Sequence, residues 1–265
     1  MMLFIDMGNT RTKLSLFTPH SSVPPTTYAV AHTSMADIAA WLRLAPQPIT
    51  HAYGIQVAGK ERASQLEALL KQANITPQWL DSTTAYAKLH NAYPEPHKLG
   101  VDRWFSAIGL VHQYAAQRKA IVHASFGTAT TVDSILLEPN SDRYQFAGGL
   151  IFPGPELMHQ SLATATANLG LGEGKQAVFP TDTRSAISTG VAAAQAGAVV
   201  RQWIATAAQC KHAPLLVCSG GGRAYVEHEL VRLLEHYCLE RSLAPVTINW
   251  QTAPALQGLA AVARI

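Results

Sequence analysis

The chain has 265 residues, of which 48% are hydrophobic and 14% are charged, and its formal net charge is +3. A chain of this length and composition buries a substantial core, which excludes disorder as its main state, and it forms one large domain or two of roughly 130 residues. Lys and Arg are scattered rather than clustered, so the sequence indicates no nucleic-acid partner.

Cysteine usage and hydropathy indicate a cellular compartment. Cys210, Cys218 and Cys238 are odd in number and lack CxxC spacing, which favours reduced thiols over a disulfide framework or a zinc site. Asp6 interrupts the first apolar run, unlike a secretory signal. No apolar run approaches the ~20 residues of a membrane span. We therefore expect a cytoplasmic protein with no membrane partner.

The first half of the chain predicts a hairpin followed by helices and strands. The hairpin runs from Leu3 to Phe17 and turns at Gly8. Two prolines within residues 91–98 predict irregular backbone there. The other expected elements are a polar turn over 21–27, a helix over 35–44 with Thr33 or Ser34 as its N-cap, a strand over 51–57, a helix over 61–73 and a helix over 104–117.

The second half repeats this order. A hairpin over 121–135 turns at Gly127, and it is followed by a strand over 144–152, a helix over 157–169, a glycine-rich loop over 170–176, an Ala-rich helix over 185–210, a strand over 215–218 and helices over 224–237 and 255–264. Because hairpin, strand and helix occur twice, we expect an α/β fold with two similar halves, residues 1–118 and 119–265, and a cleft between them.

The two hairpins share a pattern that is typical of phosphate binding. Each has a small or acidic residue two positions before a glycine, and a Thr-bearing turn after it. Gly8 and Gly127 can adopt backbone angles that a Cβ forbids, which lets amide N–H groups and hydroxyls close on an anion. A single hairpin of this kind is common in domains without a ligand, but the pair suggests a nucleotide site.

Asp6 strengthens this interpretation. A carboxylate at the end of an apolar strand is costly unless it meets hydrogen bonds or a cation. One interpretation is that Asp6 holds hydrated Mg²⁺ beside the phosphates, because this hard cation prefers oxygen ligands and retains water. The other is that Asp6 caps the turn through Asn9 and Thr10.

The segment Gly100-Val101-Asp102-Arg103 is the best catalytic candidate. It adjoins a predicted helix start, where amide groups and the helix dipole favour an anion. Asp102 could act as general base on a substrate hydroxyl, and Arg103 could bind a carboxylate through its planar guanidinium. The alternative is a structural N-cap with an ion pair. Tyr93, just before the two prolines, could line the same pocket or simply pack.

A third glycine segment, Ser219-Gly220-Gly221-Gly222, joins a predicted strand to a predicted helix. Only backbone approaches a ligand at such a place, which is consistent with adenine or ribose lying flat against Gly220 and Gly221. The alternative is a flexible turn without a ligand. No P-loop and no GxGxxG is present, so ATP would be held by another fold.

Together these segments resemble the type III pantothenate kinases, whose superfamily includes acetate kinase, sugar kinases, heat-shock chaperones and actin. The resemblance covers nearly the whole chain and implies two duplicated RNase H-like (actin-like ATPase) domains. It rests on Asp6-x-Gly8-Asn9-Thr10, Gly100-x-Asp102-Arg103, Gly127-Thr128-Ala129-Thr130-Thr131-x-Asp133, Gly148-Gly149-x-Ile151-x-Pro153-Gly154, Thr183 with Ala186 and Gly190, and Gly220-Gly221.

The resemblance implies ATP-dependent phosphorylation of pantothenate, the first step of coenzyme A biosynthesis, by a homodimer with Mg²⁺. Asp102 would take the proton of the primary hydroxyl. The residues implied for the substrate are Tyr93, Gly100, Val101, Asp102, Arg103 and Thr183. Those implied for ATP are Asp6, Met7, Gly8, Asn9, Thr10, Arg11, Thr12, Lys13 and Thr128.

One position departs from the family pattern. The family usually has Asp two residues before the second glycine, where it holds a monovalent cation, commonly potassium. This chain has Ser125 at that position. Because a hydroxyl lacks the charge to bind K⁺ or NH₄⁺ strongly, we expect weakened or absent dependence on a monovalent cation.

Two other functions remain open from the sequence. One keeps the fold and changes the acceptor to another small hydroxy acid or a sugar, although Arg103 and Tyr93 suit an acceptor with a carboxylate. The other is a non-catalytic, nucleotide-binding accessory protein, which Ser125 favours and the intact Asp6 and Asp102 oppose.

Overall fold

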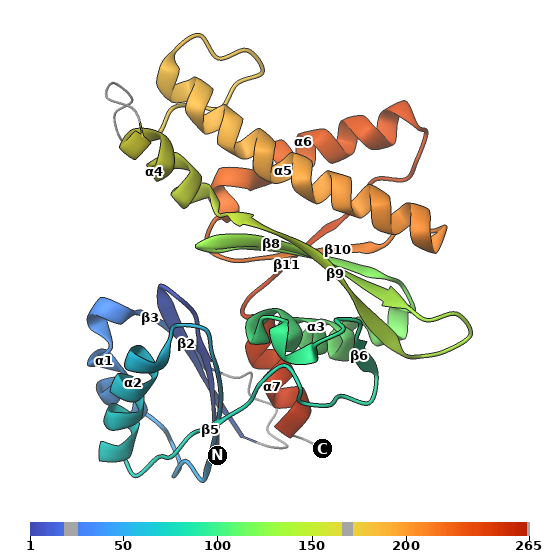
Figure 1. Cartoon of the computed structure of the whole chain (residues 1–265). Helices are drawn as coiled ribbons and strands as arrows, with labels where there is room; N and C mark the ends of the chain where they lie inside the picture. The colour runs from blue at the N-terminus through green and yellow to red at the C-terminus, as the bar shows by residue number, and fades with distance from the viewer. Residues whose placement is uncertain (19–25, 166–171, 264–265) are drawn as a thin grey trace. The chain divides into compact units, whose positions relative to one another are not determined.

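The computed structural model describes residues 1–18, 26–165 and 172–263. The chain divides into two compact units (Figure 1). The first consists of Met1–Ala116 and Ala253–Ile265, and the second of Gln117–Thr252.

The first unit is built on a mixed five-stranded sheet with the order β3-β2-β1-β4-β5. β1 is antiparallel to β2 and parallel to β4. Its strands are β1 (Met2–Met7), β2 (Arg11–Phe17), β3 (Thr26–Ala31), β4 (His51–Gln56) and β5 (Gln78–Trp79). The unit also contains the short strand β6 (Leu89–Asn91) and the helices α1 (Asp37–Leu42), α2 (Lys60–Gln72), α3 (Val101–Tyr114) and α7 (Pro254–Ala263).

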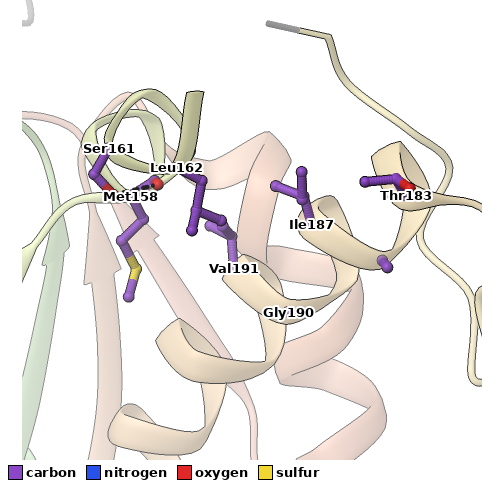
Figure 2. Close-up of a pocket in the computed structure, with 8 residues that line it drawn as sticks. Met158, Ser161, Leu162, Thr183, Ile187, Gly190 and Val191 are labelled. Atoms are coloured by element: carbon purple, nitrogen blue, oxygen red, sulfur yellow. Dashed lines mark hydrogen bonds between the residues drawn. The ribbon is translucent and has the colours of Figure 1, made fainter. Parts of the chain in front are cut away.

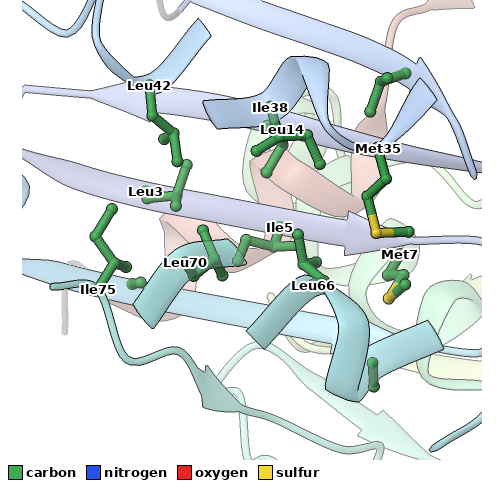
Figure 3. Close-up of a cluster of buried hydrophobic side chains, with 13 residues drawn as sticks. Leu3, Ile5, Met7, Leu14, Met35, Ile38, Leu42, Leu66, Leu70 and Ile75 are labelled. Carbon is green, nitrogen blue, oxygen red and sulfur yellow. The ribbon is translucent and has the colours of Figure 1, made fainter. Parts of the chain in front are cut away.

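Residues of β1 alternate between the two faces of this sheet. Leu3, Ile5 and Met7 lie in a buried cluster with side chains of α1 and α2 (Figure 3). Each fully buried aliphatic side chain of this kind stabilises the fold by about 1.5–3 kcal/mol. Because successive strand residues point to opposite faces, Phe4 and Asp6 lie on the other face.

α7 lies against α3 in the first unit, as Figure 1 shows. Two glycines allow the close approach of these helices. A Cβ at Gly258 would lie 1.9 Å from the carbonyl oxygen of Phe105, and one at Gly109 would lie 2.3 Å from that of Pro254. α7 also contacts β1, β2 and β4, so it completes the first unit.

The second unit has strands in the order β11-β10-β7-β8-β9, and its described residues include three helices. β7 and β8 form the second hairpin, and β7, β10 and β11 are parallel to one another. The strands are β7 (Ile121–Phe126), β8 (Ala129–Leu137), β9 (Tyr144–Pro153), β10 (Leu215–Ser219) and β11 (Ile248–Gln251). The helices are α4 (Pro155–Ala165), α5 (Thr183–Cys210) and α6 (Arg223–Glu240), and α5 and α6 pack against the apolar face of the sheet.

The predicted strands and helices of both halves are found with shifted ends, and the described residues also form three short 3₁₀ turns. α3 begins at Val101 rather than Trp104, and α6 ends at Glu240 rather than Tyr237. The expected N-cap at Thr33 or Ser34 is wrong, because α1 follows Ala36 without a side-chain cap. The sequence analysis missed β3, β5, β6 and β11. Parts of the predicted turn over 21–27, helix over 157–169, loop over 170–176 and helix over 255–264 lie outside the described residues.

The two units differ from the predicted halves in the place of α7. The sequence analysis assigned it to residues 119–265, whereas its contacts with α3 and β1 group it with the first unit. The boundary between residues 118 and 119 stays a prediction. Within the described ranges, none of the helices combines the length and the hydrophobicity that spanning a membrane requires.

Candidate active site

The first hairpin turn is an exposed loop held by main-chain hydrogen bonds. Gly8 N–H donates to the Arg11 carbonyl at 3.0 Å, and the residues between them are exposed. His32 N–H donates to the Thr10 carbonyl at 3.3 Å. The guanidinium of Arg62, on α2, donates to the Asn9 carbonyl. The turn therefore has both carbonyls of its tip bound to groups outside the hairpin.

Asp6 lies just before this turn and is 7% exposed. Its Oδ2 accepts a hydrogen bond from Lys13 Nζ, across the hairpin, at 3.4 Å. Burial raises the pKa of Asp6, Lys13 opposes that shift, and the negative charge of Asp102 adds to it. Lys13 therefore supplies a positive partner for the buried Asp6 carboxylate.

Asp102 is the second residue of α3 and is half-buried. Its Oδ1 accepts a hydrogen bond from the Arg103 N–H at 2.9 Å. The N-cap of α3 is Gly100, so Asp102 is not the structural N-cap that the sequence left open. A Cβ on Gly100 would lie 2.8 Å from Asp102 Oδ1, so the glycine leaves room for the carboxylate. Because Asp6 and Asp102 interact electrostatically, the first unit brings two predicted functional carboxylates together.

Arg103 and Tyr93, both predicted to bind substrate, also lie together. Arg103 Nη1 donates to Tyr93 Oη at 3.1 Å, and Arg103 is 6% exposed. The Asn91 side chain accepts a hydrogen bond from Tyr93 N–H at 2.9 Å, which fixes the irregular segment before the prolines. This arrangement holds a guanidinium close to Asp102 on the same helix turn.

In the second unit, three loops meet at one edge of the sheet. Gly154 N–H donates to the Thr128 carbonyl at 2.9 Å, and Gly222 N–H donates to the Phe126 carbonyl at 3.0 Å. Gly220 has φ +100°, and a Cβ there would lie 2.3 Å from the Phe126 carbonyl oxygen. Thr128, Gly220 and Gly221 are exposed. These loops follow the carboxyl ends of β7, β9 and β10, which is the side of an open α/β sheet where ligands bind.

Ser125 lies on β7 between two other hydroxyl residues. It is opposite Thr131 on β8 and beside Ser219 on β10. His123, two residues earlier on β7, shares a 2.9 Å hydrogen bond between its Nε2 and Ser219 Oγ. The neighbours of Ser125 in the sheet therefore supply hydroxyl oxygens and no carboxylate in place of the family Asp.

Thr183 is the first residue of α5 and lies far along the chain from the other substrate candidates. It lines a pocket of about 460 Å³ between α4 and α5. Figure 2 shows Leu162 of α4 beside Ile187 and Val191 of α5 in this pocket. Apolar side chains dominate the lining, so the pocket differs from the charged surroundings of Asp102.

Two details of the predicted phosphate loops need correction. Gly8 and Gly127 are not among the glycines with positive φ angles. The side chains of Met7 and Thr12 are fully buried, so only their main-chain groups remain for a contact with ATP. The sequence analysis also missed Arg62, whose place in an ordinary amphipathic helix gives no motif signal.

The chain matches the family model described as type III pantothenate kinase over residues 2–205. It is 37% identical over 266 residues to a type III pantothenate kinase of Bordetella pertussis, with 99% of this chain and 97% of that protein covered.

Among solved structures, the chain is similar to a candidate 2-dehydro-3-deoxygalactonokinase of Sinorhizobium meliloti, with a TM-score of 0.57, 12% identity and coverage of 100% and 98%. It is also similar to a glucokinase of an Antarctic psychrotroph, with a TM-score of 0.50, 11% identity and coverage of 98% and 97%. At this identity the likeness concerns the fold alone, and it confirms the predicted fold class of two duplicated α/β domains. By the family model and the identity over nearly its whole length, the chain belongs to the type III pantothenate kinase family.

Proposed function

We propose that this chain transfers the γ-phosphoryl group of ATP to the primary hydroxyl of pantothenate, forming 4'-phosphopantothenate in coenzyme A biosynthesis. Membership of the family supports the reaction. The observation that carries the site is the pair of carboxylates Asp6 and Asp102, which interact within the first unit beside Lys13.

Asp102 acts as the general base in this proposal. It lies in the first turn of α3 with one carboxylate oxygen bound to a backbone N–H, which fixes its orientation. The neighbouring Arg103 and Tyr93 bind the acceptor, because a guanidinium and a phenol suit a carboxylate and hydroxyls. Holding the hydroxyl against the base supplies the positioning on which phosphoryl transfer depends.

The residues of the first hairpin fit Mg²⁺ and the phosphates of ATP. Asp6 is a buried oxygen ligand with Lys13 beside it, which suits a hydrated hard cation next to an anion. Among the described residues, no group of three or more His, Cys, Asp or Glu side chains is placed to hold a metal ion. Asp6 would therefore hold Mg²⁺ mainly through water, and the ion neutralises phosphate charge when bound. In the second unit, we assign Thr128, Gly220 and Gly221 to the nucleotide.

A coupled ADP-release assay tests this function. The purified chain receives MgATP with pantothenate, with pantetheine, or with each of several sugars as acceptor. We expect turnover with pantothenate far above that with any sugar. A higher rate with a sugar than with pantothenate would show that a sugar is the acceptor. Binding of ATP without turnover of any acceptor would favour a non-catalytic protein.

We also propose that the dependence of the reaction on potassium is weakened or absent. The sheet neighbours of Ser125 are Thr131 and Ser219, which lack the negative charge of the family Asp. Replacing potassium with a large inert cation should change the rate by less than about tenfold, or 1.36 kcal/mol in the barrier. The variant Ser125→Asp should gain potassium dependence. A loss of about tenfold or more in the unmodified chain would contradict the proposal.

The working form is proposed to be a homodimer that covers the pocket between α4 and α5. Thr183 at the edge of this pocket is a substrate residue by family resemblance, and Met158, Ile187 and Leu162 give it an apolar surface. Exposed apolar patches of this kind mark protein interfaces.

We also propose that the protein works in the cytoplasm. Its three cysteines are free and two of them are buried, as expected in a reducing compartment.

Light scattering tests the dimer. The molar mass of the unmodified chain should be that of two copies. In Ile187→Glu the measured mass should fall toward that of one copy, because a charge in an apolar interface is costly. Val231→Glu is the matched control, since Val231 is a 37% exposed apolar residue on α6. A monomeric unmodified chain, or equal masses for the two variants, would refute this assignment.

A further inference from the structure

The tip of the first hairpin is shaped by two contacts from outside the hairpin. Arg62 on α2 donates to the Asn9 carbonyl, and His32 N–H donates to the Thr10 carbonyl at 3.3 Å. Both carbonyls are therefore held by other elements of the first unit. The Gly8 N–H bond to Arg11 closes the base of the same turn.

The orientation of these carbonyls decides where the amide groups point. A trans peptide is planar, with its C=O and N–H on opposite sides. When Arg62 binds the Asn9 carbonyl, the N–H of Thr10 is directed away from α2. A carbonyl that turned toward a phosphate would repel it, whereas successive N–H groups on one side form a concavity that binds anions.

Arg62 is suited to this task by its position and its chemistry. It lies in the first turn of α2 and is exposed, whereas Ala63 and Leu66 of the same helix are buried in the core. Val57 N–H, just before α2, donates to the Met7 carbonyl at 2.9 Å, so this helix begins beside the end of β1. Burial lowers the pKa of His32, and the positive charge of the Arg62 guanidinium lowers it further. The core thus fixes α2, and α2 presents Arg62 to the loop.

We infer that Arg62 is a positioning residue of the phosphate loop, which acts through the Asn9 carbonyl to direct the loop's amide groups toward the triphosphate of ATP. The inference rests on the proposed function only in taking ATP as the ligand. It adds a residue outside the motif segments to the reaction, on a helix that the sequence presents as purely structural. Arg62 does not touch the reacting atoms, so its removal should weaken nucleotide binding more than it slows the chemical step.

The test combines binding with kinetics. Thermal-shift titrations with AMP-PNP, tripolyphosphate and adenosine compare the unmodified chain with Arg62→Ala, Arg62→Lys and the control Lys71→Ala. Lys71 is an exposed cation in the last turn of the same helix. For Arg62→Ala we expect the concentrations of AMP-PNP and tripolyphosphate that give half of the full thermal shift to rise about five- to tenfold. This is the size of the loss of one ordinary hydrogen bond, because Arg62 acts on the phosphates only through the loop. The corresponding adenosine concentration should stay unchanged.

Kinetics should show the same separation. The KM for ATP should rise by a similar factor in Arg62→Ala, while the KM for pantothenate and kcat stay within about twofold. Arg62→Lys, which keeps a charged donor, should recover part of the loss and also serves if the alanine variant folds poorly. The inference is overturned if Arg62→Ala matches Lys71→Ala, if adenosine weakens equally, or if Arg62→Lys recovers nothing. Binding of AMP-PNP without phosphorylation of pantothenate would refute the proposed function while the titrations still decide the role of Arg62.

Discussion

Replacing Asp102 with Asn should lower kcat for pantothenate phosphorylation by about 100- to 10,000-fold, the range that general bases contribute. The amide keeps the size of the carboxylate and an oxygen that accepts from the Arg103 N–H, so the first turn of α3 should be preserved. What it loses is the capacity to take a proton. Steady-state kinetics with saturating ATP measure the effect, and the KM for pantothenate should change much less than kcat.

Asp37→Asn is the matched control for this change. Asp37 is an exposed acidic residue in the first turn of α1, so its replacement removes the same kind of charge from a helix start. It should leave kcat unchanged. An Asp102→Asn variant that turns over as fast as the unmodified chain would remove the basis for a general base at this position.

Replacing Asp6 with Asn should have opposite effects on activity and on stability. Loss of the carboxylate should lower kcat/KM by about 100-fold or more, because metal-assisted charge neutralisation is worth several kcal/mol. The melting temperature should rise, since the ionised carboxylate is buried and its removal relieves the cost of desolvation. Lys13, with 39% of its side chain exposed, remains hydrated without its partner.

The pH dependence of this stability gain follows from the raised pKa of Asp6. A group whose pKa is higher in the folded state stabilises the fold below its unfolded pKa, and this stabilisation is lost as pH rises through the folded pKa. Asp6→Asn should therefore be more stable than the unmodified chain at neutral pH, and the difference should vanish below about pH 4. Calorimetry without Mg²⁺ measures it, at about 2–4 °C for each kcal/mol.

Asp81→Asn is the control, because the pKa of Asp81 is lowered whereas that of Asp6 is raised. Hydrogen bonds from Thr83 lower the pKa of Asp81, so its carboxylate stabilises the fold at neutral pH and loses that role as the pH falls. Its replacement should give no gain in melting temperature and no loss of activity. A stability gain in both variants would trace the effect to net charge, and a loss of stability in Asp6→Asn would contradict the assigned desolvation cost.

The fold was largely predictable because its longer helices and strands space their apolar residues regularly over many positions. The two hairpins and α2 follow from alternation and helical spacing alone. The missed strands β5 and β6 are two and three residues long, too short for a periodic pattern. The early start of α3 was missed because Asp102 and Arg103 read as a charged loop, whereas in the structure they occupy its first turn.

The site was predictable to the extent that motifs mark it. Asp6, Asp102, Arg103 and Tyr93 were all named from the sequence, and the structure shows contacts or electrostatic interactions among them. Arg62 could not be found this way, because its contact with Asn9 joins residues 53 positions apart and depends on how α2 packs. Sequence spacing also could not tell that Thr12 is buried.

The position of α7 has a consequence for how the chain matures. This helix follows the second unit along the chain, yet its glycine contacts with α3 belong to the first unit. Because domains fold as they leave the ribosome, the second unit can fold before α7 has been synthesised. At that stage the first unit still lacks this helix. Because α7 contacts β1, the strand that carries Asp6 reaches its final surroundings only after the second unit has been synthesised.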